Sequence, residues 1–203
     1  MFVTLALSVI GFIVYSVVAG AAIHYALTEY QTPGFGVVSE SFSFAFDRVG
    51  TIIGVQIIQA LIIAGLAVLS VFIMFIDFLI SFAMIFLIMY VAVRLAPAQA
   101  IVIAEERPAV ESVSRAWQIT GGQFWHVFLA QLLLGIIVLI IDIGLAFAAG
   151  FILPFIVPDL FLILLLSSLI SSLIVSSINY VYLPVLYKDL EARGISGDYD
   201  WWQ

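Results

Sequence analysis

The chain has 203 residues, of which 65% are hydrophobic and only 9% are charged. Its mean hydropathy is +1.29. Soluble domains are about half apolar and about a quarter charged, and a single core of this size cannot bury such an excess. Lipid is therefore the expected solvent for much of the chain. Thirteen acidic and six basic residues, with no cysteine, exclude a nucleic-acid-binding module and a disulfide scaffold; the apolar excess excludes a soluble enzyme.

Long apolar stretches predict an all-α integral membrane bundle of about five transmembrane helices. A bilayer crossing takes about 20 apolar residues of helix. The stretch from Val49 to Val93 is too long for one crossing, so we expect it to turn near its single acidic residue, Asp77. The expected spans cover residues 2–27, 49–75, 78–96, 123–149 and 159–187 of a single membrane domain, 1–193, and an acidic cytoplasmic tail, 194–203, follows.

The basic residues predict the orientation of these spans. Short loops rich in Lys and Arg stay in the cytoplasm. Five spans place all the basic residues on one face, which predicts a cytoplasmic-membrane protein with its amino terminus outside and its carboxyl terminus inside. A cleaved signal peptide is the alternative for residues 1–27, but that stretch lacks a basic start and its apolar run is too long. The basic residues are Arg48, Arg94, Arg107, Arg115, Lys188 and Arg193.

Two segments outside the spans carry a pattern. Residues 41–47 space three phenylalanines two apart, and we interpret them as an interfacial segment because an isolated strand would lack a partner. Residues 108–120 predict a short amphipathic helix on the cytoplasmic surface, with a favourable pair between Glu111 and Arg115. This helix is either a connector between spans or a docking site for a partner. Its apolar face is expected to hold Val110, Val113 and Trp117.

A few polar side chains fall inside the expected spans. Asp142 is placed near the outer interface, where it has either a purely structural role or a role in moving a proton or an ion. Four amides, Gln56, Gln59, Gln131 and Asn179, are expected to form hydrogen bonds between helices. The alternative is that they line a polar path through the membrane.

Small residues form two stripes at helical spacing. Gly50 and Gly54 make a GxxxG pattern, and Ser168, Ser172 and Ser176 make a serine ladder. Such stripes let membrane helices approach closely, so we expect packing within the chain or between copies. A serine-lined conduit is the alternative.

No pattern for catalysis, a cofactor or a metal is present. Neither His24 nor His126 has a second histidine at metal-ligand spacing, and there is no HExxH pair. The GxSxG elbow of serine hydrolases and a phosphate-binding glycine loop are also missing. We therefore expect no catalytic residue, no cofactor and no metal.

The stretch from Tyr90 to Leu134 combines an arginine at a helix end, Pro108, a short helix containing Ser-Arg-Ala-Trp and a Gly-Gly-Gln-Phe-Trp start to the next span. It resembles the membrane domain of the glycerophosphoryl diester phosphodiesterase family and related prokaryotic multi-pass proteins of unassigned function. The resemblance implies a membrane module without the catalytic domain, since nothing after Arg193 would supply one. That family commonly has six spans, so an upstream helix would be missing. The matching residues are Arg94, Ser114, Arg115, Trp117, Thr120, Gly122, Phe124 and Trp125.

These patterns predict a non-enzymatic accessory or scaffold subunit of a membrane assembly. Its expected partners are the lipid bilayer and other membrane subunits or a second copy, and not nucleic acid. The alternative is a transporter or channel for a small or lipid-like substrate, which requires Asp142, Gln56, Gln59 and Gln131 to converge on one cavity. A lipid-acting membrane enzyme is a third class. The acid excess suits the cytoplasm of a salt-loving prokaryote, or it is a chance property of short loops.

Overall fold

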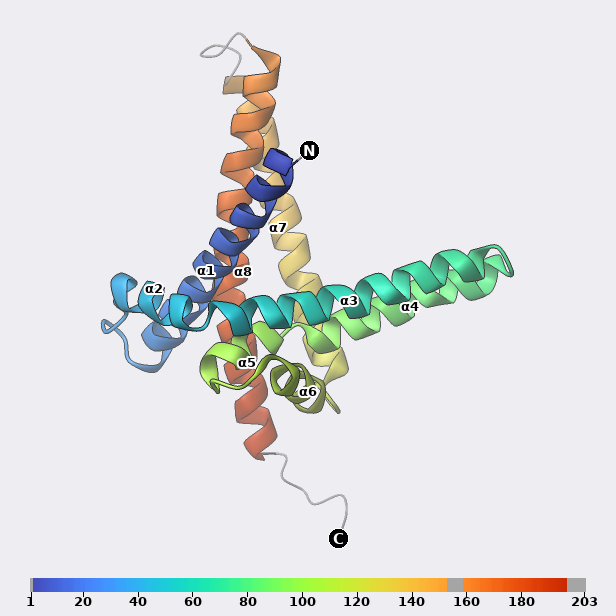
Figure 1. The fold of residues 1–203 in the computed structure, drawn as a ribbon, viewed down its shortest axis with the longest axis horizontal. Helices are drawn as coiled ribbons and strands as arrows, with labels where there is room; N and C mark the ends of the chain where they lie inside the picture. The colour runs from blue at the N-terminus through green and yellow to red at the C-terminus, as the bar shows by residue number, and fades with distance from the viewer. Residues whose placement is uncertain (1, 153–158, 197–203) are drawn as a thin grey trace.

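The computed structural model of the chain is all-α, which confirms the expected fold class (Figure 1). It describes residues 2–152 and 159–196, and no strand occurs among them. Most of the expected loop between the spans 123–149 and 159–187, and the end of the acidic tail, 197–203, lie outside these residues. The helices are α1 (Phe2–Gln31), α2 (Val38–Asp47), α3 (Val49–Met74), α4 (Phe78–Leu95), α5 (Ala98–Ala104), α6 (Ala109–Ile119), α7 (Phe124–Ile152) and α8 (Leu160–Ser196).

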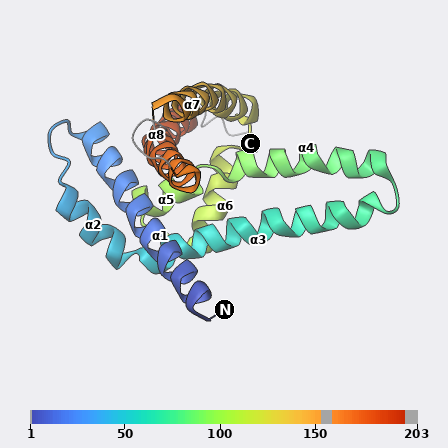
Figure 2. The same cartoon turned by 90° about the horizontal axis from the view of Figure 1, so that it is seen from above.

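Helices α3 and α4 form a hairpin that turns at Asp77, as the sequence predicts. The Asp77 carboxylate accepts hydrogen bonds from the backbone N–H groups of Leu79, at 2.7 Å, and Ile80, at 3.2 Å. It thereby caps the amino-terminal end of α4, where the backbone N–H groups have no acceptor within the helix. The hairpin extends to one side, across the direction of α7 and α8, in both views (Figures 1 and 2).

Helix α5 forms the centre of the molecule. Proline lacks a backbone N–H and cannot continue the hydrogen-bond ladder of a helix, so Pro97 separates α5 from α4. The side chains of Ala98, Ala100, Ile101 and Val102 are completely buried among α1, α3, α6 and α8. The predicted third span ends at residue 96, which places this segment in a cytoplasmic loop. It is instead a core helix, because its small side chains let four helices approach it.

Helix α6 is the expected amphipathic helix, but its predicted apolar face is wrong at Val110, whereas Val113 packs against the core and Trp117 contacts Tyr90. The completely buried side chains are Ser112 and Ala116, whereas Val110 is 71% exposed. Small residues face inward because α6 packs closely on α3 and α5. The predicted pair of Glu111 with Arg115 is also wrong, since Arg115 pairs with another acidic residue, described below.

The segment with three alternating phenylalanines is helical and forms most of α2. Ser41 on this helix bonds the Nδ1 atom of His24 at 3.1 Å. The Phe44 ring stacks on the His24 ring at a centroid distance of 4.2 Å. Phe46, two residues after Phe44, lies on another side of the helix and is exposed. These contacts attach α2 to α1 beside the apolar helices.

Five helical stretches within the described residues are long and apolar enough to cross a membrane. The third includes both α4 and α5, so the chain passes through Pro97 without losing its apolar character. The stretches are Ser8–Gln31, Val49–Met74, Phe78–Ala104, Phe124–Ile152 and Leu165–Arg193.

Candidate functional site

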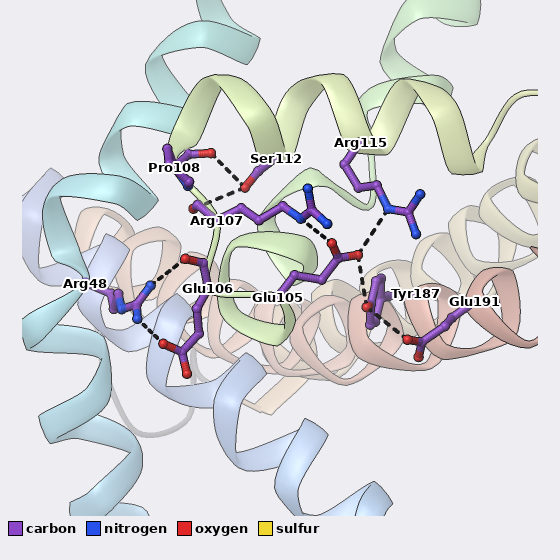
Figure 3. A network of polar contacts seen from close by, with 9 residues as sticks. All are labelled: Arg48, Glu105, Glu106, Arg107, Pro108, Ser112, Arg115, Tyr187 and Glu191. Carbon is purple, nitrogen blue, oxygen red and sulfur yellow. Dashed lines mark hydrogen bonds and ion pairs between the residues drawn. The ribbon is translucent and has the colours of Figure 1, made fainter.

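The loop between α5 and α6 organises a network of polar side chains (Figure 3). Its centre is the Glu105 carboxylate, of which one oxygen, Oε2, lies 2.5 Å from Arg107 Nε. The other oxygen, Oε1, accepts from Arg115 Nε at 3.3 Å and from the Tyr187 hydroxyl at 3.2 Å. One carboxylate thus joins the loop to α6 and to the end of α8.

A second set of contacts extends this network to the other helix ends. Arg48, between α2 and α3, donates to the Glu106 carbonyl oxygen at 2.9 Å and pairs with its carboxylate. On α8, Lys188 pairs with Glu191 at 2.7 Å. The carboxylate of Asp189, also on α8, lies 2.5 Å from His126 Nε2 and 3.0 Å from Arg193 Nε. We call all of these contacts, together with those of Glu105, the polar layer.

Arg94 at the end of α4 holds the family-like segment together. Its Nη1 donates to the Tyr90 hydroxyl at 2.7 Å, its Nε donates to Thr120 Oγ1 at 3.2 Å, and its Nη2 donates to the Trp117 carbonyl oxygen. The guanidinium also lies 4.2 Å from the centroid of the Trp117 ring. Thr120 is completely buried. The structure therefore brings Arg94, Trp117 and Thr120 into one cluster.

The other residues that match the phosphodiesterase membrane domain lie outside the Arg94 cluster or at its edge. Gly122 has a φ of +45°, a left-handed conformation that glycine adopts without steric cost, and it turns the chain from α6 into α7. The Phe124 ring lies 4.8 Å from the Tyr90 ring. Arg115 belongs to the polar layer, and Ser114 and Trp125 are exposed.

A cavity of about 530 Å³, which we call the central cavity, lies between the apolar helices. This volume is typical of small-molecule sites. Each of the five candidate spans contributes a polar side chain to its wall. In chain order these side chains are Tyr15, Gln59, Gln99, Gln131 and Asn179, and Ser176, Tyr180 and Tyr182 add hydroxyls from the last span.

The wall of this cavity carries hydrogen-bonding groups and no Asp, Glu, Lys, Arg or His among its described residues. The Gln59 amide donates to the Leu95 carbonyl oxygen at 2.6 Å, and the Asn179 amide donates to the Val175 carbonyl oxygen at 3.1 Å. The Tyr182 hydroxyl is buried and has no hydrogen-bond partner in the described part of the chain. Such a wall suits an uncharged, hydrogen-bonding ligand.

The transporter or channel alternative requires four residues to line one cavity, and two of them lie outside the central cavity. Gln56 accepts a hydrogen bond from the Ser16 hydroxyl at 2.8 Å and does not line the cavity. Asp142 contacts the Ser171 hydroxyl in a separate hollow between α7 and α8. The prediction that these residues line one cavity is therefore wrong for Gln56 and Asp142, whereas Gln59 and Gln131 both line the central cavity.

The small residues pack unequally. A Cβ atom on Gly54 would lie 3.0 Å from Ala109 Cβ on α6, whereas a Cβ on Gly50 would have no neighbour within 4 Å among the described residues. The serines divide among three hollows. Ser168 and Ser172 lie beside Asp142, Ser176 lines the central cavity, and Ser172 and Ser176 both line a groove between α1 and α8.

Sequence reasoning missed several cavity residues. Gln99 lies beyond residue 96, the end of the predicted third span. Tyr15 and Tyr182 were counted as apolar members of their spans. The signal that points to Gln99 is the continued run of apolar residues after Pro97. Among residues 2–152 and 159–196, no three His, Asp or Glu side chains are grouped to hold a metal ion.

The helices and the candidate spans define an all-α, multi-pass membrane protein. No family model, curated protein or solved structure matches the chain. The resemblance to the phosphodiesterase membrane domain therefore stays a prediction.

Proposed function

We propose that this protein is a non-enzymatic membrane protein that binds a small or lipid-like uncharged molecule in its central cavity, whose wall includes Gln59 and Gln131 of the predicted transporter site but not Gln56 or Asp142. One observation carries the proposal: all five candidate spans contribute a polar side chain to one cavity, and no charged side chain of the described residues lines it. Polar groups inside a membrane are costly unless they serve packing or a ligand.

The test is a stabilisation screen on the purified protein with uncharged and charged compounds. A compound present at about 100 times its dissociation constant adds about 2.7 kcal/mol to the free energy of unfolding. We expect uncharged, hydrogen-bonding compounds to raise the melting temperature, and Gln131→Leu to remove that rise. The control is Gln118→Leu on the exposed side of α6, which should keep it. Stabilisation by charged compounds alone, or a rise that survives Gln131→Leu, contradicts the proposal.

A second candidate is the accessory or scaffold subunit predicted from the sequence. The observation that favours it is the α3–α4 hairpin, in which Leu61, Phe72 and Phe86 are exposed apolar side chains. Other membrane subunits or a second copy would cover this surface. Recovery of a stoichiometric complex in mild detergent supports this candidate, and a monomer stabilised by a cavity ligand speaks against it.

We also propose the cytoplasmic membrane of a prokaryote as the location, with the amino terminus outside and the polar layer in the cytoplasm. The gathering of the basic residues at one end of the helices supports this orientation. An acidic protein of this kind suits a salt-loving host. We further propose that the chain is related to the phosphodiesterase membrane domain, on the motif around Arg94.

The absence of natural cysteine makes the orientation simple to measure. We expect an impermeant maleimide to label Ile76→Cys, in the α3–α4 turn, on intact cells. Ser114→Cys on α6 should react only after the membrane is opened. Both positions are exposed on the protein. The reverse pattern of labelling contradicts the proposed orientation.

A further inference from the structure

A second hollow, the apolar groove, runs between α1, α2 and α8 and has a volume of about 630 Å³. Its wall is mostly apolar, with a few hydroxyls, and includes Val18, Ala22, Phe42, Leu173 and Val181. No charged side chain lines it among the described residues. The groove therefore fits a hydrocarbon chain better than a polar molecule.

The apolar groove and the central cavity meet at three residues. Tyr15, Ser176 and Tyr180 line both hollows. The rings of Tyr15 and Tyr180 lie 6.2 Å apart, and all three residues carry a hydroxyl group. These side chains form a polar boundary, with amides on one side and apolar side chains on the other.

The geometry points to an amphiphile with an uncharged, hydrogen-bonding headgroup in the central cavity and an acyl chain in the apolar groove, as in a monoacylglycerol. This inference rests on the proposed function and names its ligand class. The headgroup meets the amides of Gln59, Gln99 and Gln131 and the unpartnered hydroxyl of Tyr182. Burial of a charged headgroup there would leave the charge without a partner, at a large cost in free energy. An uncharged headgroup is therefore favoured over a phosphate or a free carboxylate.

The experiment uses a photoreactive probe in a membrane. The full chain is placed in phosphatidylcholine nanodiscs with a monoacylglycerol that carries a diazirine halfway along its chain. After irradiation, mass spectrometry should place the adducts on the peptides containing Val18, Phe42 and Val181. Unlabelled monooleoylglycerol should compete, whereas oleate and glycerol should not. Adducts spread evenly over the outward faces of α3, α4 and α7, or equal competition by oleate, overturn the inference.

Matched variants separate the groove from the cavity. Val18→Trp fills the groove and should reduce the adduct yield, whereas Val68→Trp on the outward face of α3 should not. Tyr182→Phe and Gln131→Leu should each weaken binding about fivefold to tenfold, as the loss of one hydrogen bond does. Tyr182→Phe removes a hydroxyl without a partner in the described chain, so the protein should still fold. Equal yields from Val18→Trp and Val68→Trp overturn the inference.

The outcomes also distinguish this inference from the proposed function. If soluble uncharged compounds stabilise the protein through Gln131 while the probe does not reach the groove, the proposed function stands and the amphiphile inference fails. If neither kind of compound depends on Gln131, both fail.

Discussion

Glu105→Ala is expected to destabilise the protein by about 2–3 kcal/mol, which corresponds to a fall of about 5–10 °C in the melting temperature. The carboxylate is mostly buried, with 16% of its side chain exposed, and it bonds Arg107, Arg115 and Tyr187. Its removal leaves two guanidinium groups and a hydroxyl without their shared acceptor. Thermal unfolding in mild detergent, followed by circular dichroism, measures the change.

Glu111→Ala is the matched control for this variant. Glu111 is exposed on α6 and takes part in no ion pair within the described residues. Its substitution should change the free energy of unfolding by less than about 0.5 kcal/mol. Glu105→Gln keeps the shape and one acceptor oxygen but not the charge, so its effect should lie between the two. Equal melting temperatures for Glu105→Ala and Glu111→Ala would show that the polar layer does not hold the helices together.

Arg94→Ala is expected to destabilise the protein by about 3 kcal/mol. Three hydrogen bonds from a charged donor are lost, each worth about 1.5–3 kcal/mol before the chain relaxes, together with the contact on the Trp117 ring. Arg94→Lys should recover only part of this loss, because an ammonium group cannot match the fork of a guanidinium. Chemical unfolding in detergent measures both changes.

Two further variants test the origin of that loss. Tyr90→Phe removes one acceptor of Arg94 and should cost about 1 kcal/mol. Arg193→Ala removes a surface ion pair, whose side chains are 47% and 39% exposed, and should cost less than about 1 kcal/mol. If Arg94→Ala costs no more than Arg193→Ala, Arg94 does not fasten α4 to α6.

Local patterns predicted the elements better than they predicted the faces of those elements. The acid at Asp77 located a turn, because a carboxylate at that point both interrupts an apolar run and caps the next helix. The amphipathic pattern located α6 but assigned its apolar face to Val110, which is exposed. Close packing on α3 and α5 selected Ser112 and Ala116 instead, and helical periodicity does not contain that information.

The candidate site was predicted only in part for a similar reason. Gln59 and Gln131 were recognised as polar residues in apolar spans, and they do share a cavity. Gln56 lies within one turn of Gln59, yet it faces Ser16 on another helix. A rotation of one residue around a helix axis decides between the two positions, and the sequence does not specify it.

The sequence by itself determined that the protein is helical, that it crosses a membrane several times and that its basic residues are confined to a few short segments. These properties follow from composition and from stretch length, because lipid accepts only long apolar segments with satisfied backbones. The tertiary structure alone decided that α5 is the core and that polar side chains from all five candidate spans meet in one cavity. Those arrangements depend on contacts between helices far apart in the chain, which no local pattern records.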